Sequence, residues 1–139
     1  MESNAALVGP DAESLPLVQA VGQRLGAHWH VFVKVRRGDR SVELKLETPD
    51  GLRGRPVVIL DDICSTGATL IATIQRARAE GAVDVRVVVV HAMFSDETQA
   101  RLIQAGASQI VSTDSIAHPT NAISLGDLLA GSLGSEVNP

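Results

Sequence analysis

The stretch that most constrains this chain is residues 57–70, where an apolar run meets two carboxylates, a series of small and hydroxylated residues, and a helical repeat. The first four residues predict a short buried strand, because three of them are β-branched. Apolar residues then recur at helical spacing, and a glycine ends the predicted helix. The order is therefore strand, acidic pair, small-residue turn and helix. The helical positions are Leu70, Ile71, Ile74 and Ala77, with Gly81 as the stop.

The turn at residues 65–69 has the features of a phosphate-binding loop. A helix N-terminus leaves backbone N–H groups unpaired, and the helix dipole there favours an anion. Ser65, Thr66 and Thr69 add hydroxyl donors. Gly67 and Ala68 allow an oxyanion to come close to the backbone. No Gly-Lys-Ser/Thr sequence is present, so this is not a Walker loop.

The acidic pair Asp61 and Asp62 narrows the choice of ligand. Two carboxylates beside a phosphate would repel it unless something lies between them. Sugar hydroxyls can donate hydrogen bonds to carboxylates, and Mg²⁺ can bridge carboxylates and phosphates. The residues therefore favour a phosphorylated sugar with Mg²⁺ nearby, and the alternative is an ordinary strand-to-helix turn.

The alternation of predicted strands and helices indicates an α/β fold with a doubly wound, mostly parallel sheet and right-handed crossovers. Residues 30–35 and 42–46 predict two strands joined by a basic, glycine-containing loop, which together form an antiparallel flap hairpin. Ligands of such sheets bind outside the carboxyl ends of the strands. Seven polar side chains are therefore expected along one edge: Asp11, Lys34, Arg36, Asp61, Asp62, His91 and Asp114.

The chain divides into three parts on its sequence. Residues 1–6 are interpreted as a ragged N-terminus or a cloning remnant. Residues 7–130 form one domain that ends in a short helix over residues 125–130, and residues 131–139 are expected to be a disordered tail.

Charge and composition exclude some classes of function. The net charge of −4 argues against a nucleic-acid-binding protein, which would usually be basic. No apolar run is long enough to span a bilayer, so no membrane partner is expected. The single cysteine excludes an internal disulfide and indicates a cytoplasmic location.

Residues 57–70 resemble the phosphoribosyl-diphosphate loop shared by type I phosphoribosyltransferases and ribose-phosphate diphosphokinases. Its usual form is an apolar strand, Asp-Asp, two apolar residues, Asp or Ser, and Thr-Gly-Gly-Thr; Ala68 stands here at the second glycine. Four flanking segments resemble the C-terminal domain of the diphosphokinases in particular, and the resemblance covers residues 7–130. They are Val8-Gly9-Pro10-Asp11, Lys34-Val35-Arg36, His91-Ala92-Met93-Phe94-Ser95 and Ser112-Thr113-Asp114-Ser115-Ile116.

The resemblance implies an enzyme of nucleotide biosynthesis that transfers pyrophosphate from ATP to the C1 hydroxyl of ribose 5-phosphate. It implies that residues Ser65, Thr66, Gly67, Ala68 and Thr69 hold the 5-phosphate while Asp61 and Asp62 bind the ribose hydroxyls. It further implies that Asp11 is linked to Mg²⁺, and that Lys34 and Arg36 stabilise the transferring group as catalytic residues.

Family members carry an N-terminal domain of similar fold that supplies much of the ATP site. We therefore expect this chain to be the C-terminal domain alone, which binds ribose 5-phosphate with little or no turnover, and the full-length protein to be a homo-oligomer. Two alternatives stay open: a type I phosphoribosyltransferase, or a non-catalytic regulatory relative. No segment suited to binding a nitrogenous base supports the first, and the presence of Lys34 and Arg36 argues against the second.

Overall fold

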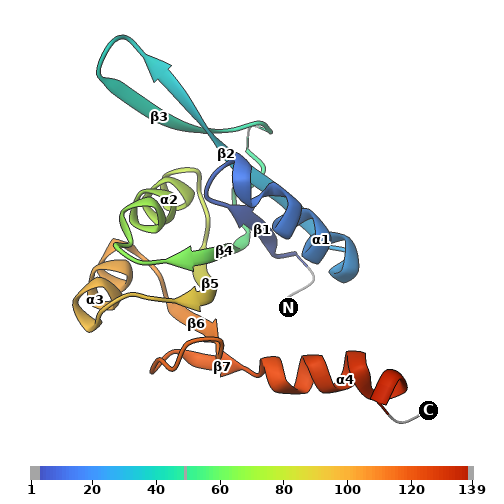
Figure 1. Cartoon of the computed structure of the whole chain (residues 1–139). Helices are drawn as coiled ribbons and strands as arrows, with labels where there is room; N and C mark the ends of the chain where they lie inside the picture. The colour runs from blue at the N-terminus through green and yellow to red at the C-terminus, as the bar shows by residue number, and fades with distance from the viewer. Residues whose placement is uncertain (1–3, 49, 138–139) are drawn as a thin grey trace.

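The fold is built on one seven-stranded sheet with helices on both faces (Figure 1). A computed structural model describes residues 4–48 and 50–137. The strand order is β3-β2-β1-β4-β5-β6-β7, and every neighbouring pair is parallel except β2 and β3. The predicted α/β class, with a mostly parallel sheet and one antiparallel hairpin, is confirmed.

The elements alternate along the chain as the sequence predicted. The strands are β1 (Ala6–Gly9), β2 (His28–Arg37), β3 (Ser41–Leu46), β4 (Pro56–Cys64), β5 (Asp84–Ala92), β6 (Gln109–Thr113) and β7 (Asn121–Ile123). The helices are the 3₁₀ turn η1 (Ala12–Ser14), α1 (Leu15–Leu25), α2 (Ala68–Ala79), α3 (Asp96–Ala105) and α4 (Leu125–Val137).

The main hydrophobic core lies between the sheet and helices α2 and α3. Successive residues of a strand point to opposite faces, and the core side of β5 is completely buried at Val85, Val87 and Val89. Helix α1 packs on the other face, where Val18 contacts a smaller cluster around Leu7 and Leu60. Branched aliphatic residues fill both layers, as the scarcity of aromatic residues requires.

The sheet changes winding direction between β1 and β4. The crossover through α1 leads from β1 to β2, whereas the crossovers through α2 and α3 lead the opposite way, from β4 to β5 and β6. Strands β1 and β4 are direct neighbours, with Ala6 opposite Val57 and Val8 opposite Ile59. A crevice forms at the carboxyl ends of strands where the winding reverses, and ligands of open α/β sheets bind there.

The hairpin of β2 and β3 projects well beyond the rest of the sheet (Figure 1). Its strands pair from Phe32 opposite Leu46 out to Arg37 opposite Ser41. An ion pair of 2.7 Å between Arg37 Nε and Glu43 Oε2 links the two strands near the tip. Residues at the tip are exposed, whereas Glu43 also lies 3.8 Å from Arg76 of α2, so this helix contacts the hairpin below its tip.

Two strands extend beyond the sequence prediction. Strand β4 includes Asp61 and Asp62, which the sequence placed after the strand, because its pairing with β5 continues to Cys64 opposite Ala92. Strand β7 is not among the strands that the sequence predicted. The side chain of Asn121 holds it to β6, donating to Ser112 Oγ at 2.9 Å and to the Thr113 carbonyl at 2.6 Å.

The limits of the domain differ from the prediction at both ends. Ala5 and Ala6 are buried and Ala6 begins β1, so this part of the expected ragged start belongs to the sheet; Met1–Ser3 lie outside the described residues. Helix α4 continues to Val137 where a disordered tail from Gly131 was expected, and residues 138–139 are not described. Two side chains organise the start of α4: Asp114 Oδ1 accepts from the Leu125 N–H, and Ser124 Oγ accepts from the Asp127 N–H.

Candidate functional site

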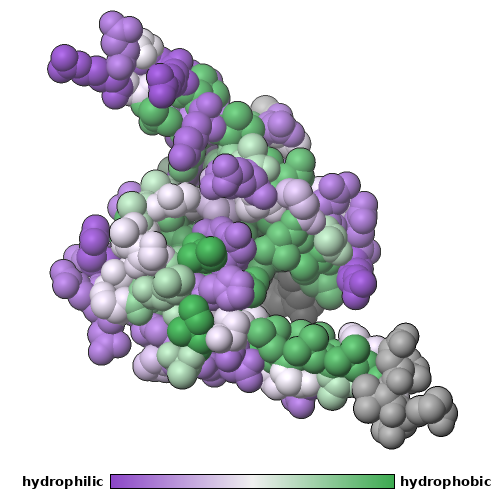
Figure 2. All heavy atoms as spheres, viewed as in Figure 1, coloured by the Kyte–Doolittle hydropathy of each residue, from purple (hydrophilic) through white to green (hydrophobic). Residues whose placement is uncertain are grey.

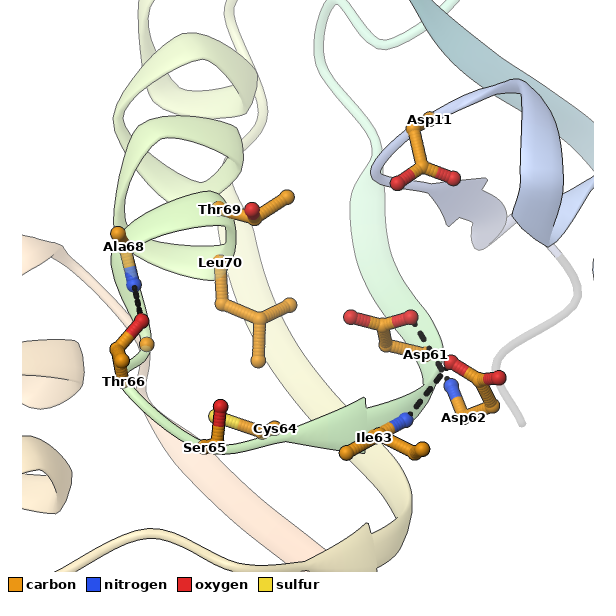
Figure 3. Close-up of a pocket in the computed structure, with 11 residues that line it drawn as sticks. Asp11, Asp61, Asp62, Ile63, Cys64, Ser65, Thr66, Ala68, Thr69 and Leu70 are labelled. Atoms are coloured by element: carbon orange, nitrogen blue, oxygen red, sulfur yellow. Dashed lines mark hydrogen bonds between the residues drawn. The ribbon is translucent and has the colours of Figure 1, made fainter.

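A polar cavity of about 180 Å³ opens at the crevice between β1 and β4 (Figure 3). It is lined by Asp11, which follows β1, and by residues 61–70, which run from the end of β4 into α2. All seven residues predicted to bind the sugar phosphate line this cavity, together with the predicted metal residue. The fold thus brings Asp11 to the acidic pair although the two are far apart in sequence.

Carboxylates form one wall of the cavity. Asp61 Oδ1 accepts a hydrogen bond of 3.0 Å from the Asp62 N–H, and Asp62 Oδ1 accepts one of 2.8 Å from the Ile63 N–H. Burial raises the pKa of Asp61 to about 6, and the negative charges of Asp62 and Asp11 act in the same direction. The wall therefore concentrates negative charge that a cation or hydroxyl donors would relieve.

The start of α2 forms the opposite wall. Thr66 Oγ1 accepts from the Ala68 N–H at 3.4 Å, and the Ile71 N–H donates to the Gly67 carbonyl at 2.8 Å. Within the described chain, the N–H groups of Ser65, Thr66, Thr69 and Leu70 have no hydrogen-bond partner. The hydroxyls of Ser65, Thr66 and Thr69 belong to exposed residues on this wall. Amides and hydroxyls that face the same cavity at a helix N-terminus suit an anion such as a phosphate.

Gly67 allows the loop to take this shape. Its φ of +78° lies in the left-handed region, which glycine adopts without steric cost. A Cβ at this position would lie 2.6 Å from Cγ2 of Thr98, a buried residue in the first turn of α3. Thr98 could not be predicted as a support of the loop, because no pattern around residue 98 indicates contact with residue 67.

Asp11 is held in place by Ser14. Asp11 Oδ1 accepts from the Ser14 N–H at 3.1 Å, and Ser14 Oγ donates to the Asp11 carbonyl at 2.6 Å. Ser14 stands at the N-cap position of α1, but its side chain contacts Asp11, which caps η1. Gly9 makes room for this arrangement, since a Cβ there would lie 2.1 Å from Ser14 Oγ. The pair Asp11 and Ser14, three residues apart, was the sequence signal for this cap.

The predicted catalytic residues lie on β2, beside the cavity. Lys34 is exposed and lines a second hollow of about 460 Å³ together with Asp11, Ala12 and Glu13. Asp11 therefore belongs to both hollows. Arg36 lies two residues farther along β2, on the same face of the strand as Lys34, in the exposed part of the hairpin.

The two remaining residues of the expected polar edge do not line the cavity. His91 Nδ1 lies 2.8 Å from Ser115 Oγ, so its ring joins β5 to the loop after β6. Asp114 accepts from the backbone of α4. Both side chains therefore make contacts within the fold and do not belong to the cavity lining.

Comparison with known proteins decides the family. Residues 1–123 match the family model of the phosphoribosyl transferase domain. The chain belongs to this family. Because the match covers most of the chain, it includes both walls of the cavity and both strands of the hairpin.

Among curated proteins, this phosphoribosyl transferase domain is similar to archaeal ribose-phosphate pyrophosphokinases. It is 32% identical over 130 residues to the protein of Methanosarcina acetivorans, covering 94% of this chain and 46% of the relative. It is 34% identical over 119 residues to the protein of Thermoplasma acidophilum, covering 86% of this chain and 41% of the relative. The chain thus spans about half the length of the curated relatives it matches.

Solved structures support the same fold. The phosphoribosylpyrophosphate synthetase of Mycobacterium smegmatis aligns over 96% of this chain and 45% of its own, with a TM-score of 0.74 and 21% identity. The adenine phosphoribosyltransferase (APRTase) of Giardia lamblia, crystallised with 9-deazaadenine, aligns over 80% of this chain and 69% of its own, with a TM-score of 0.65 and 17% identity.

The carboxylate wall of the phosphoribosyl transferase domain fits a Mg²⁺ ion that takes some of its ligands from the protein and the others from bound substrates. No cluster of three or more candidate metal ligands occurs within residues 4–48 and 50–137. Mg²⁺ usually needs only one or two carboxylates, and it completes its shell with water and substrate phosphates. Asp11, Asp61 and Asp62 offer oxygen ligands on one wall, where burial above all raises the pKa of Asp61 and the charges of Asp62 and Asp11 act in the same direction.

Cys64 belongs to the packing of the phosphoribosyl transferase domain. The residue is buried, and burial together with the charge of Asp61 raises the pKa of its thiol to about 11. A thiol with such a pKa is almost entirely protonated at neutral pH, so it is a poor nucleophile. Cys64 therefore fills space in the core at the end of β4.

The raised pKa of Asp61 predicts a pH-dependent gain in stability for Asp61→Asn. A carboxyl group whose pKa is higher in the folded state than its ordinary 3.8 loses folding stability as pH rises from about 4 to about 6. Asparagine carries no charge and retains an oxygen that can accept from the Asp62 N–H. The variant should therefore gain more in unfolding free energy at pH 7.5 than at pH 4.5, measured by urea denaturation. Asp39→Asn, in the exposed hairpin loop, controls for the loss of one negative charge; equal gains of Asp61→Asn at both pH values would contradict the assignment.

Proposed function

We propose that this domain binds ribose 5-phosphate and acts as the sugar-phosphate-binding half of a ribose-phosphate pyrophosphokinase. The reaction transfers pyrophosphate from ATP to the C1 hydroxyl of the sugar and gives phosphoribosyl diphosphate and AMP. One observation carries the proposal: a single cavity has carboxylates on one wall and free amides and hydroxyls on the other. Ribose 5-phosphate has the matching polarity, with hydroxyl donors at one end and an anion at the other.

The two walls receive separate parts of the sugar phosphate. The 5-phosphate binds at residues 65–69, where the start of α2 supplies donors and a favourable dipole. The ribose hydroxyls donate to Asp61 and Asp62, which keeps the two carboxylates apart from the phosphate. Asp11 and the acidic pair would hold Mg²⁺, which would supply positive charge against the bound phosphates.

ATP lies beside the sugar, toward the hairpin. Lys34 lines the hollow that shares Asp11 with the sugar-phosphate cavity, so its ammonium group reaches the space between the two substrates. Lys34 and Arg36 stabilise the negative charge that develops on the transferring pyrophosphate. The projecting hairpin carries both cations and closes over the substrates, which would exclude water.

In this proposal the isolated chain can bind ribose 5-phosphate, but turnover needs the rest of the enzyme. The chain spans about half the length of the matched relatives, and the ATP site is completed by the other half of the enzyme. The isolated chain therefore binds ribose 5-phosphate but forms little or no AMP. The complete enzyme is a cytoplasmic homo-oligomer in this proposal. No helix of the described chain has the length and apolar character needed to cross a membrane.

Isothermal titration calorimetry tests the proposal with three probes: ribose 5-phosphate, ribose and inorganic phosphate, each with Mg²⁺. Ribose 5-phosphate should bind more tightly than either fragment, because it reaches both walls. Thr66→Val should weaken ribose 5-phosphate and phosphate, whereas Asp62→Asn should weaken ribose 5-phosphate and ribose. A loss of about tenfold is expected for each, as for one hydrogen bond to a charged group.

The same titrations separate the alternatives. Binding of phosphoribosyl diphosphate and a nitrogenous base, without ATP, would favour a type I phosphoribosyltransferase. Binding of nucleotides alone would favour a regulatory relative. Robust formation of AMP by the isolated chain would refute the division of binding from turnover, and absence of any ribose 5-phosphate binding would refute the proposal itself.

A further inference from the structure

One face of the central sheet is incompletely covered. Parallel sheets normally have both faces buried by helices. On β5 the residues facing α2 and α3 are completely buried, whereas Val88 and Val90 on the opposite face are partly exposed. Helix α1 covers only part of this opposite face. An apolar groove of about 300 Å³ remains beside α1, and its lining includes Leu7, Val21, Leu25, Val58, Val88 and Val111.

Helix α4 carries an apolar stripe that has no partner in the described chain. Leu125, Leu128, Leu129 and Leu133 have the i, i+3, i+4, i+8 spacing that places side chains on one face of a helix. Leu128, Leu129 and Leu133 are 57%, 58% and 49% exposed. The helix makes no substantial contact with another described helix or strand, and Figure 1 shows it extending away from β7. Figure 2 shows a continuous hydrophobic row along it.

We infer that α4 of one molecule docks in the apolar groove of a second copy, and that the two copies exchange these helices reciprocally. One chain contains both halves of the contact, so a twofold pair forms it twice. Hydrogen bonds from the Leu125 and Asp127 N–H groups to Asp114 and Ser124 hold the start of α4 in its outward direction. This direction favours a groove on another molecule over the groove of the same chain.

The size and charge of α4 agree with its docking in the groove of a second copy. A helix of 13 residues is about 20 Å long, which fits within the length of β4 or β5. The groove is lined by Arg86, whose Nε pairs with Asp84 Oδ2 at 2.8 Å; its side chain is 46% exposed and can also meet the exposed Asp127 in the first turn of α4. Two helices of this length and about 10 Å in width bury roughly 800 Å² in total, at the low end of protein interfaces. A dissociation constant in the micromolar range is therefore expected.

Crosslinking of variants with one added cysteine tests the exchange in the full chain. Leu25→Cys places a thiol at the groove and Leu129→Cys places one on the helix stripe; both positions are exposed, and the native Cys64 is buried. Treated with a short bis-maleimide, a mixture of the two variants should give covalent dimers, and each variant alone should give far fewer. Ile103→Cys, exposed on α3 outside both surfaces, replaces Leu25→Cys in the control mixture and should give few dimers.

A chain that carries both Leu25→Cys and Leu129→Cys tests whether α4 docks on a second copy or on its own groove. Covalent dimers support exchange between copies. A crosslink within a single chain would overturn the inference, because it would mean that α4 folds back on its own groove.

In sedimentation velocity, Leu129→Asp should weaken the dimer at least about 30-fold, as expected for a central apolar contact, while Ile103→Asp should have little effect. A wild-type chain that stays monomeric at about 100 µM would also overturn the inference. These measurements use no sugar phosphate, so their outcome is independent of the proposed function.

Discussion

Replacing Lys34 with alanine should lower the turnover of pyrophosphate transfer by about 10²–10³, the loss expected when one donor to the transition-state charge is removed. Because the chain spans about half the length of the relatives it matches, the proposed activity is assayed with this domain joined to a second half like theirs. Lys34 is exposed beside Asp11, where the two hollows meet, so its charge lies close to the transferring group in the proposed arrangement. The effect should fall on kcat, because positive charge that acts on the transition state contributes little to binding of the sugar.

Lys45→Ala provides a matched control for Lys34→Ala. Lys45 is the other lysine of the chain and lies on β3 of the same hairpin, opposite Val33. It lines neither hollow, and its replacement should change turnover less than threefold. Lys34→Ala should leave calorimetric binding of ribose 5-phosphate to the isolated domain nearly unchanged. A loss of turnover under threefold for Lys34→Ala would count against its catalytic role.

Replacing Gly67 with alanine should weaken ribose 5-phosphate binding by at least about 100-fold, since the loop would have to move to make room for the methyl group. Two effects combine at this position. The φ of +78° is unfavourable for alanine, and the added Cβ would lie 2.6 Å from Cγ2 of the buried Thr98. The loop can relieve the collision only by moving away from α3, which displaces the amides and hydroxyls of residues 65–69 from a common phosphate position.

Gly54→Ala separates collision from backbone strain. Gly54 has a similar φ of +70°, but a Cβ there would meet nothing within 4 Å. This control should lose about 1 kcal/mol of stability from the left-handed backbone and retain its affinity for ribose 5-phosphate. Thermal unfolding of both variants, followed by calorimetry on the folded protein, measures the two effects separately. Equal affinities for Gly67→Ala and Gly54→Ala would show that the contact with Thr98 does not hold the loop.

Much of the candidate site could be predicted from residues that are neighbours in sequence. Strand β4, the turn at residues 65–69 and helix α2 follow one another directly, so each is indicated by local patterns of apolar, small and hydroxylated residues. The cavity wall formed by residues 61–70 needs no distant partner to place its donors and acceptors on one side. The end of β4 was misjudged because pairing with β5, which local periodicity does not report, extends the strand through Asp61 and Asp62.

Details that depend on packing could not be predicted in the same way. The side chain of Ser14 supports Asp11 and does not cap α1, although the neighbouring sequence is compatible with either role. Strand β7 exists because Asn121 bonds to β6, although its own sequence indicates a turn. Helix α4 passes through Gly131 and Gly134, each of which lowers helix stability by about 1 kcal/mol without ending the helix.

The sequence by itself determined the α/β class and the set of hydrogen-bond donors in the turn at residues 65–69. Both depend on the spacing of apolar residues and on residue types within a few neighbouring positions. Only the tertiary structure decided that Asp11 joins the acidic pair, that Thr98 packs on Gly67, and that one face of the sheet stays open. These features follow from which strands become neighbours and where the winding of the sheet reverses. Contacts between segments distant in sequence determine the order of the strands, and no pattern within either segment alone indicates those contacts.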